Sequence, residues 1–283
     1  MRQNALKISQ TFSDRGLTEW LERSLSEGQP IDSRFEELLP RSPSSLVHFI
    51  EPPSPSEIYR DFVPVYQVMR RLKNQGFTPD FVLDVGASSG IWSHTAGLVF
   101  LESRFILIDP LMSKYGEQAR DYYLKRTPNP TFLECAISNQ AGKTTFQVSP
   151  DLYGSSLLNP ADFRTYESIE VTIRTLDEIA QDQKLAGRGM LKIDVQCAEH
   201  LVLEGATQLL PLVDAIIIEL SFVRYDPKAL VFAEMLELLT GLGFRYYDET
   251  GDWRSPIDGT LLQKEIVFLR NELLVPSTSQ DIT

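Results

Sequence analysis

The sequence predicts an open, doubly wound α/β sheet of the Rossmann-like kind, and three observations support this fold class. Apolar segments of strand length recur from residue 81 onward, as expected of parallel strands that are buried on both faces. Several of these segments end in an acidic residue. A loop of small residues, 86–90, follows the first segment and leads into a helical pattern, which is typical of a nucleotide site.

The first strand and its loop form the stretch FVLDVGASSG, residues 81–90. Its G-x-x-x-G spacing lacks the G-x-G-x-x-G of dinucleotide sites and the lysine of a P-loop. An aspartate at the strand end would repel pyrophosphate but would pair with an ammonium group, and backbone N–H groups of the loop suit a carboxylate. S-Adenosylmethionine carries an ammonium group, a carboxylate and a ribose, so the loop predicts this cofactor; an ordinary strand-to-helix turn is the alternative. The cofactor-binding residues expected here are Asp84, Gly86, Ala87, Ser88 and Gly90.

Composition excludes several classes of protein. The 283 residues suffice for one large α/β domain with an appendage, or for two small domains. A net charge of −12 argues against binding to nucleic acid or to anionic membranes, and it also favours solubility. Cys135 and Cys197 form no disulfide framework and show no zinc-ligand spacing. Because no export signal or long apolar run is evident, we expect a cytoplasmic protein that acts on a small molecule.

The expected organisation is a helical appendage with a Pro-rich connector over residues 1–75, an α/β domain over 76–272 and a polar tail over 273–283. Apolar residues at helical spacing predict one helix near 17–25 and a second from about 55 to 74, which Pro64 should kink or split. The second helix could cover the cofactor pocket or pack on the sheet, and we favour packing.

Residues 104–108 are predicted to form the second strand, which ends in Asp109. An acidic residue there is placed to accept hydrogen bonds from ribose hydroxyls, although an Asp-Pro pair also starts turns. Residues 131–137 are predicted as a third strand, in which Ala136 would line the adenine or belong to the core. Residues 144–148 and 169–173 alternate like exposed strands and are predicted to pair as an antiparallel insertion.

The segment MLKIDVQCAEHLVLEGA, residues 190–206, predicts a buried strand followed by a helix. Asp194 lies at the end of this strand, where it could accept the proton of an attacking hydroxyl or cap the helix. Lys192 would be an interior cation that needs a partner, either a carboxylate or the substrate. The catalytic candidates are Asp194, Glu199 and His200, with His94 as a further candidate that is more often structural.

Three further strands complete the pattern, over residues 215–218, 244–247 and 264–269, with a helix over 227–240. Glu219 ends the first of them. Asp194 and Glu219 could hold a divalent metal, but no spacing in the sequence requires one. The aromatic stretches around Tyr246 and Trp253 could line the acceptor or form a homodimer contact.

Together these motifs resemble the FkbM family of S-adenosylmethionine-dependent methyltransferases. The matching pieces run in the family's order from about residue 80 to 270: FVLDVGASSG, IDP, CAIS, AGKTTF, SSLL, VTIRTLDEIA, LKIDVQCAEHLVLEGA and IIIEL. The resemblance implies a class I methyltransferase fold, a seven-stranded and mostly parallel sheet flanked by helices, with the last strand antiparallel. It also implies methyl transfer, usually to a hydroxyl oxygen of a sugar or a natural product.

One departure from the family concerns the turn after Asp194. The family usually has Glu-Gly where this chain has Gln196 and Cys197. Glutamine keeps the size but cannot hold a proton or a negative charge at neutral pH. The missing glycine indicates that the turn needs no positive φ or tolerates a small side chain.

Two function classes therefore stay open. One is O-methylation by direct displacement, in which the protein mainly aligns the acceptor. The other is a catalytically idle protein that binds S-adenosylmethionine or acts as a scaffold. The missing G-x-G-x-x-G argues against an NAD-dependent oxidoreductase.

Overall fold

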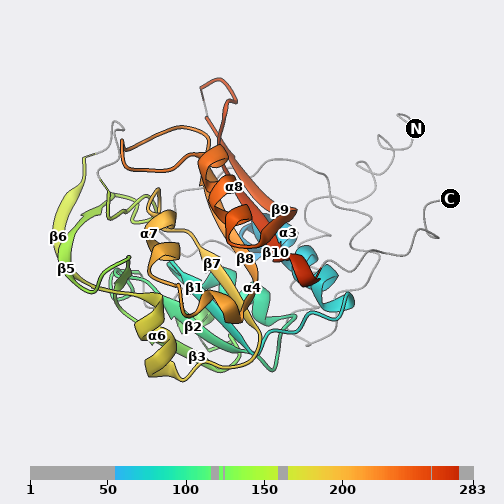
Figure 1. The fold of residues 1–283 in the computed structure, drawn as a ribbon. Coiled ribbons are helices and arrows are strands. Elements are labelled where there is room, and N and C mark those ends of the chain that lie inside the picture. The colour runs from blue at the N-terminus through green and yellow to red at the C-terminus, as the bar shows by residue number, and fades with distance from the viewer. Residues whose placement is uncertain (1–54, 116–120, 124, 159–164, 256, 274–283) are drawn as a thin grey trace, which may run out of the picture.

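The computed structural model describes residues 55–115, 121–123, 125–158, 165–255 and 257–273 (Figure 1). The helix predicted near residues 17–25, the connector before residue 55 and the tail beyond residue 273 lie outside the described residues.

A seven-stranded sheet forms the centre of the molecule, with the strand order β3-β2-β1-β7-β8-β10-β9 (Figure 1). The strands are β1 (Phe81–Val85), β2 (Arg104–Ile108), β3 (Pro130–Leu133), β7 (Gly189–Ile193), β8 (Val213–Ser221), β9 (Phe244–Arg254) and β10 (Leu261–Arg270). The pairs from β3 to β8 are parallel, whereas β10 runs antiparallel to both β8 and β9. This is the class I methyltransferase fold, and the prediction of a mostly parallel sheet with an antiparallel last strand is confirmed.

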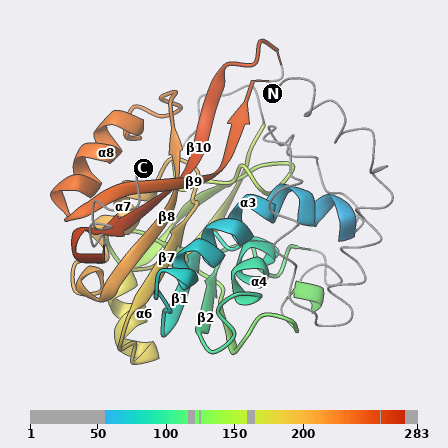
Figure 2. The same cartoon turned by 90° about the vertical axis from the view of Figure 1, so that its right-hand side faces the viewer.

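Side-chain alternation along these strands produces one apolar core on each face of the sheet. Leu83, Leu191 and Ile218 face α6 (Leu176–Gln183), α7 (Glu199–Glu204) and α8 (Phe232–Gly241). Val82, Met190 and Ile217 face α3 (Pro55–Asn74) and α4 (Ile91–Gly97). Figure 2 shows these two groups of helices on opposite sides of the sheet. Short 3₁₀ helices span Leu210–Leu212 and Asn271–Leu273.

Helix α3 packs on the sheet, which confirms the expectation of packing. Its apolar face, which includes Val68, Met69 and Leu72, is buried in the same core as Val82. An ion pair between Arg71 and Asp248 (2.5 Å) also ties this helix to β9. The helix is continuous through Pro64, so that residue does not split it.

A second, three-stranded sheet lies beside the first, with the order β4-β6-β5. Its strands are β4 (Ala136–Ile137), β5 (Gly142–Val148) and β6 (Glu167–Arg174). β5 and β6 are antiparallel, which confirms the predicted insertion. No helix within the described ranges combines the length and the apolarity needed to cross a membrane.

The prediction of one continuous strand over residues 131–137 is wrong. The chain leaves the main sheet after Leu133, and Ala136 pairs with Ile173 of β6. The break has a packing reason, because this segment serves two cores. Cys135 and Ile137 are buried against the main sheet, whereas Ala136 is buried in the core of the small sheet.

The turn after β1 packs backbone against backbone on the turn after β7. Gly86 has φ +82°, and a Cβ atom at this residue would lie 1.8 Å from the carbonyl oxygen of Asp194. The N–H of Asp194 in turn donates a hydrogen bond to the carbonyl oxygen of Val85 (2.9 Å). Only glycine allows this approach, so the two strand ends are locked together.

We expect Gly86→Ala to lower the free energy of unfolding by more than about 3 kcal/mol, because it adds a backbone collision to the strain of a left-handed residue. Gly76→Ala is the matched control: its φ is +86°, but a Cβ atom there would meet nothing within 4 Å. The control should lose only about 1–2 kcal/mol. Urea unfolding curves measure both variants, and equal losses would show that the turns move apart without cost.

Candidate active site

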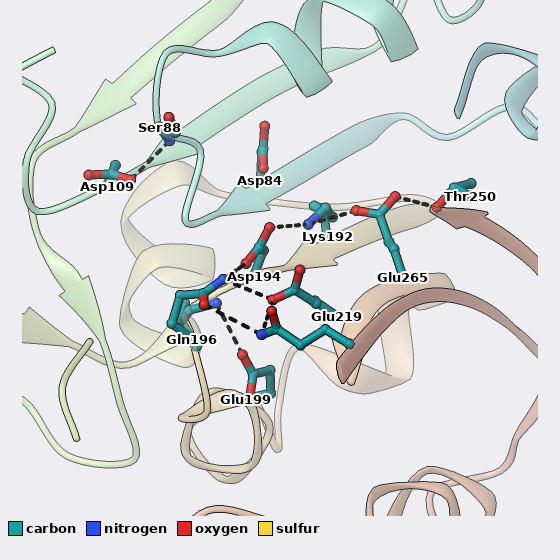
Figure 3. A network of polar contacts seen from close by, with 12 residues as sticks. Asp84, Ser88, Asp109, Lys192, Asp194, Gln196, Glu199, Glu219, Thr250 and Glu265 are labelled. Carbon is teal, nitrogen blue, oxygen red and sulfur yellow. Dashed lines mark hydrogen bonds and ion pairs between the residues drawn. The ribbon is translucent and has the colours of Figure 1, made fainter. Parts of the chain in front are cut away.

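Polar side chains gather at the carboxyl ends of the central strands, on the face that α3 and α4 cover. Asp84 is the register partner of Lys192 between β1 and β7, and Glu219 is that of Glu265 between β8 and β10. Register partners project to the same side of a sheet. We call the following group the strand-end cluster, of which Figure 3 labels every member but Gln263: Asp84, Lys192, Asp194, Gln196, Glu219, Gln263 and Glu265.

Lys192 is the cation of this cluster, and only 3% of its side chain is exposed. Its Nζ lies 2.9 Å from Oε1 of Glu265 and 3.2 Å from Oδ2 of Asp194. Burial alone would lower the pKa of Lys192, but the negative charges of Asp194, Glu265 and Asp84 raise it above its ordinary value. The lysine is therefore charged, and the expectation that it needs a carboxylate partner is confirmed.

Asp84 is buried at the end of β1, and its Oδ2 accepts a hydrogen bond from the hydroxyl of Ser93 on α4 (2.6 Å). Burial raises the pKa of Asp84 to about 6, although the charge of Lys192 acts in the opposite direction. At neutral pH this residue carries a negative charge that its surroundings only partly compensate.

The backbone of the glycine loop is tied to β2. The N–H groups of Gly86 and Ala87 both donate to the carbonyl oxygen of Ile108, at 2.9 and 3.1 Å. Ser88 N–H donates to Oδ2 of Asp109 (2.9 Å), and Gly90 N–H donates to Ala87 O (2.8 Å). These four N–H groups bind within the chain, and the expectation that N–H groups of this loop receive a cofactor carboxylate stays a prediction.

Asp109 starts a turn and also holds the glycine loop. Its Oδ1 accepts from the N–H of Leu111 (2.8 Å), and its Oδ2 accepts from Ser88. Burial raises the pKa of Asp109 to about 6, while these two N–H groups lower it. Asp109 therefore does start a turn, which was one of its two predicted roles. Beside it, the rings of Tyr115 and Tyr153 pack on each other with their centroids 5.9 Å apart, and the charge of Asp109 acts on the pKa of Tyr115. No motif in the sequence pointed to these two tyrosines.

Gln196 joins two carboxylates from neighbouring strands (Figure 3). Its Nε2 donates to Oδ1 of Asp194 (2.9 Å) and to Oε2 of Glu219 (2.8 Å). Nε2 of Gln263 donates to the same Glu219 oxygen (2.8 Å). The Asp194 side chain is 31% exposed, so a ligand at this edge can reach it. Sequence reasoning missed Gln263, which comes from β10, and also missed Glu265.

The turn after Asp194 requires left-handed backbone at two residues that are not glycine. Gln196 has φ +56° and Cys197 has φ +77°, so the option that the turn needs no positive φ is wrong. Glu199 holds this turn, because its Oε1 accepts from the N–H groups of Val195 (3.2 Å) and Cys197 (3.1 Å). Burial raises the pKa of Glu199 to about 7. Glu199 therefore supports the cluster through the backbone.

Among the described residues, no contact joins either candidate histidine to the strand-end cluster. Burial lowers the pKa of His200, and the charge of Glu204 on the same helix counters this effect. His94 is buried behind the glycine loop, where its ring lies 5.6 Å from that of Tyr123. Burial lowers the pKa of His94 to about 4, so this histidine is neutral and contributes to packing.

A metal site is also not evident. Across the residues that the structure describes, no three His, Cys, Asp or Glu side chains are arranged to hold a metal ion.

We expect Lys192→Met to lower the free energy of unfolding by about 3–5 kcal/mol at pH 8, because it leaves buried carboxylates without their cation. The loss should shrink near pH 5, since the abandoned carboxylates then bind protons in the folded state. Lys143→Met is the control, because Lys143 pairs with Glu170 (2.7 Å) on an exposed strand. Urea unfolding at both pH values measures the effect. A loss no larger than that of the control would mean that Lys192 does not hold the cluster.

Comparison with known proteins identifies the family. No curated protein matches the sequence. Among solved structures, magnesium protoporphyrin IX methyltransferase from Synechocystis PCC 6803 with bound SAH aligns over 91% of this chain and 99% of its own, with a TM-score of 0.41 and 12% identity. The 1,6-didemethyltoxoflavin-N1-methyltransferase from Burkholderia thailandensis aligns over 76% and 81%, with a TM-score of 0.38 and 14% identity. The family model described as methyltransferase FkbM domain matches residues 84–246, more than half of the chain, and the protein therefore belongs to the FkbM methyltransferase family.

Proposed function

We propose that this protein transfers a methyl group from S-adenosylmethionine to a hydroxyl oxygen of a sugar or of a natural product. The observation that carries the proposal is the placement of Asp84, Asp109 and Asp194, which follow or end three adjacent parallel strands within the family's domain. Ligands of open α/β sheets bind at this carboxyl edge.

The residues at this edge fit the cofactor. Asp84 and Asp109 are buried carboxylates whose raised pKa values show that their charges are poorly compensated. An ammonium group beside Asp84 and ribose hydroxyls beside Asp109 would supply the missing donors. Ala136 and Tyr115 share one apolar cluster beside Asp109, and we assign them to the wall of the adenine pocket.

The glycine loop contributes shape to this pocket. Its backbone is bound to Ile108 and Asp109, and Gly86 and Gly90 both have positive φ. A rigid, side-chain-poor loop lets a ligand approach the ends of β1 and β2. In this assignment Gly86, Ala87, Ser88 and Gly90 border the cofactor without having to donate their N–H groups.

When bound, S-adenosylmethionine supplies a methyl group made electrophilic by the adjacent sulfonium. The protein must then hold an acceptor oxygen in line with it, and this alignment is the main source of catalysis in a direct displacement. Asp194 is partly exposed at the edge and fixed by Lys192 and Gln196, so we assign it to orienting the acceptor hydroxyl. Glu199 keeps the turn that carries it in shape.

Isothermal titration of the protein with S-adenosylmethionine tests the cofactor assignment. Asp109→Ala should weaken binding at least about tenfold, because hydrogen bonds to a charged group contribute about 1.5–3 kcal/mol. Asp258→Ala is the control, since Asp258 makes the same type of turn bond, to Thr260 N–H (3.0 Å), on the β9–β10 loop. Absence of binding to well-folded wild-type protein would rule out the assignment.

The affinity for S-adenosylmethionine should rise from pH 5 to pH 7.5. Asp84 and Asp109 have pKa values of about 6 in the free protein, and the ligand's ammonium and hydroxyl groups favour their charged forms. Binding below neutral pH must then release protons, which titration in two buffers of different ionisation enthalpy detects. An affinity that does not change with pH would contradict the pairing of Asp84 with the ammonium group.

Turnover separates the proposed enzyme from a catalytically idle binder. We expect the protein to transfer labelled methyl groups from S-adenosylmethionine to at least one member of a panel of methyl glycosides and phenolic natural products. Tight binding without transfer to any of these acceptors would favour the idle protein.

A further inference from the structure

Asp194 and Glu219 lie at the ends of neighbouring strands, but their hydrogen bonds differ in kind. Asp194 accepts from the ammonium group of Lys192 at Oδ2 and from the amide of Gln196 at Oδ1. Both of its oxygens are therefore bound, one of them to a positive charge. Neither oxygen of Asp194 is thus left without a partner for an incoming proton donor.

Glu219 is held by neutral donors instead. The side-chain amides of Gln196 and Gln263 both donate to its Oε2 at 2.8 Å. One amide comes from the turn after β7 and the other from β10, so the carboxylate is fixed from two elements. The hydrogen bonds that described residues make to Glu219 end on Oε2, which leaves Oε1 for a donor on a ligand.

The charges around Glu219 disfavour its ionised form. Burial raises the pKa of Glu219 well above its ordinary value, and the negative charges of Asp194, Glu199 and Glu265 raise it further, while Lys192 lowers it. These groups come from the end of β7, from α7 and from β10, and they surround the carboxylate. A base whose pKa has moved toward the working pH removes protons more effectively than an ordinary glutamate.

We propose that Glu219 is the general base that takes the proton of the acceptor hydroxyl, and that Gln196 and Gln263 are positioning residues that hold it. The proposal depends on the methyl transfer proposed above. As the acceptor oxygen bonds to the methyl carbon, the carbon–sulfur bond breaks, and its electron pair stays on sulfur, which loses its positive charge. The hydroxyl proton passes to Oε1 of Glu219 and is later released to water.

In this arrangement Gln196, which replaces the glutamate usual in the family, has a function of its own. A glutamate at this position would place a further negative charge between Asp194 and Glu219, where the amide now donates to both. The amide links the two carboxylates but, unlike a cation, it does not neutralise Glu219. Gln196 is thus part of the working site.

Protein stability tests the proposal without any acceptor. Glu219→Gln keeps the shape of the side chain and an oxygen for the two amides, but removes the charge. We expect a higher urea midpoint than wild type at pH 8 and an equal one near pH 5, because a raised carboxyl pKa makes the ionised form costly and the protonated form harmless. Asp194→Asn should lower the midpoint at pH 8, since it deprives Lys192 of a partner. A lower midpoint for Glu219→Gln at both pH values would overturn the proposal.

The pH profile of kcat provides the second test, with methyl glycosides as acceptors. Wild-type kcat should rise with pH, and Glu219→Gln should reduce it about 10²–10⁴-fold and abolish the rise. The affinity for S-adenosylmethionine should not change. Glu219→Asp should retain the rise at a lower kcat, and Gln196→Leu should lower kcat and shift the profile.

The same measurements on Asp194→Asn identify the alternative base. If the rise is lost in Asp194→Asn and kept in Glu219→Gln, Asp194 is the base and the proposal is wrong. A wild-type protein that binds S-adenosylmethionine but methylates none of the acceptors contradicts the proposed function and, with it, the role of Glu219 as base. If methyl transfer does occur but Glu219→Gln leaves kcat and its pH profile unchanged, only the assignment of Glu219 is wrong.

Discussion

The buried ammonium group of Lys192 is the interaction on which the carboxyl edge of this sheet depends. It lies on β7, the middle strand, and contacts Asp194 on its own strand end and Glu265 on β10, with Asp84 on β1 close enough to act on its pKa. Removing a charge from water is costly unless partners surround it. Here the lysine and its carboxylates compensate one another, and the strands that carry them are fixed in register.

Two neutral side-chain amides bind carboxylate oxygens that Lys192 does not contact. Gln196 and Gln263 bind an oxygen of Glu219 without cancelling its charge, so Glu219 keeps a raised pKa. Perturbed pKa values of this kind concentrate at functional sites, where a protein gives up some stability for reactivity. Each face of the sheet carries an apolar core, and the polar residues of the strand-end cluster lie at the carboxyl edge of the face that α3 and α4 cover.

Much of the fold followed from local pattern. Continuous apolar segments identified the buried strands, and alternation identified β5 and β6, because both patterns depend on which faces of a strand meet solvent. The break after Leu133 could not be predicted, since it depends on two cores that lie on different sides of one segment. The bonding of the Gly86 and Ala87 N–H groups to Ile108 depends on how β2 lies against the loop, which is a tertiary property.

Site residues could be predicted from the sequence where they lie at the end of a single apolar segment of strand length. Asp84, Asp109 and Asp194 could be located from the sequence because each follows an apolar segment. Gln263 and Glu265 could not, since their place is set by the antiparallel register of β10 against β8. The left-handed backbone of Gln196 and Cys197 was also hidden, because it is held by Glu199 from the following helix.

The position of β10 has a consequence for how the protein is made. This strand lies between β8 and β9, although both are synthesised before it. A chain growing on the ribosome therefore presents Lys192 and Glu219 before it contains Glu265 and Gln263, and β9 has no strand to pair with until residue 261 is added. Chains fold from the N-terminus during synthesis only as far as their partners exist. The strand-end cluster is thus completed in one late step, when β10 pairs with β8 and β9.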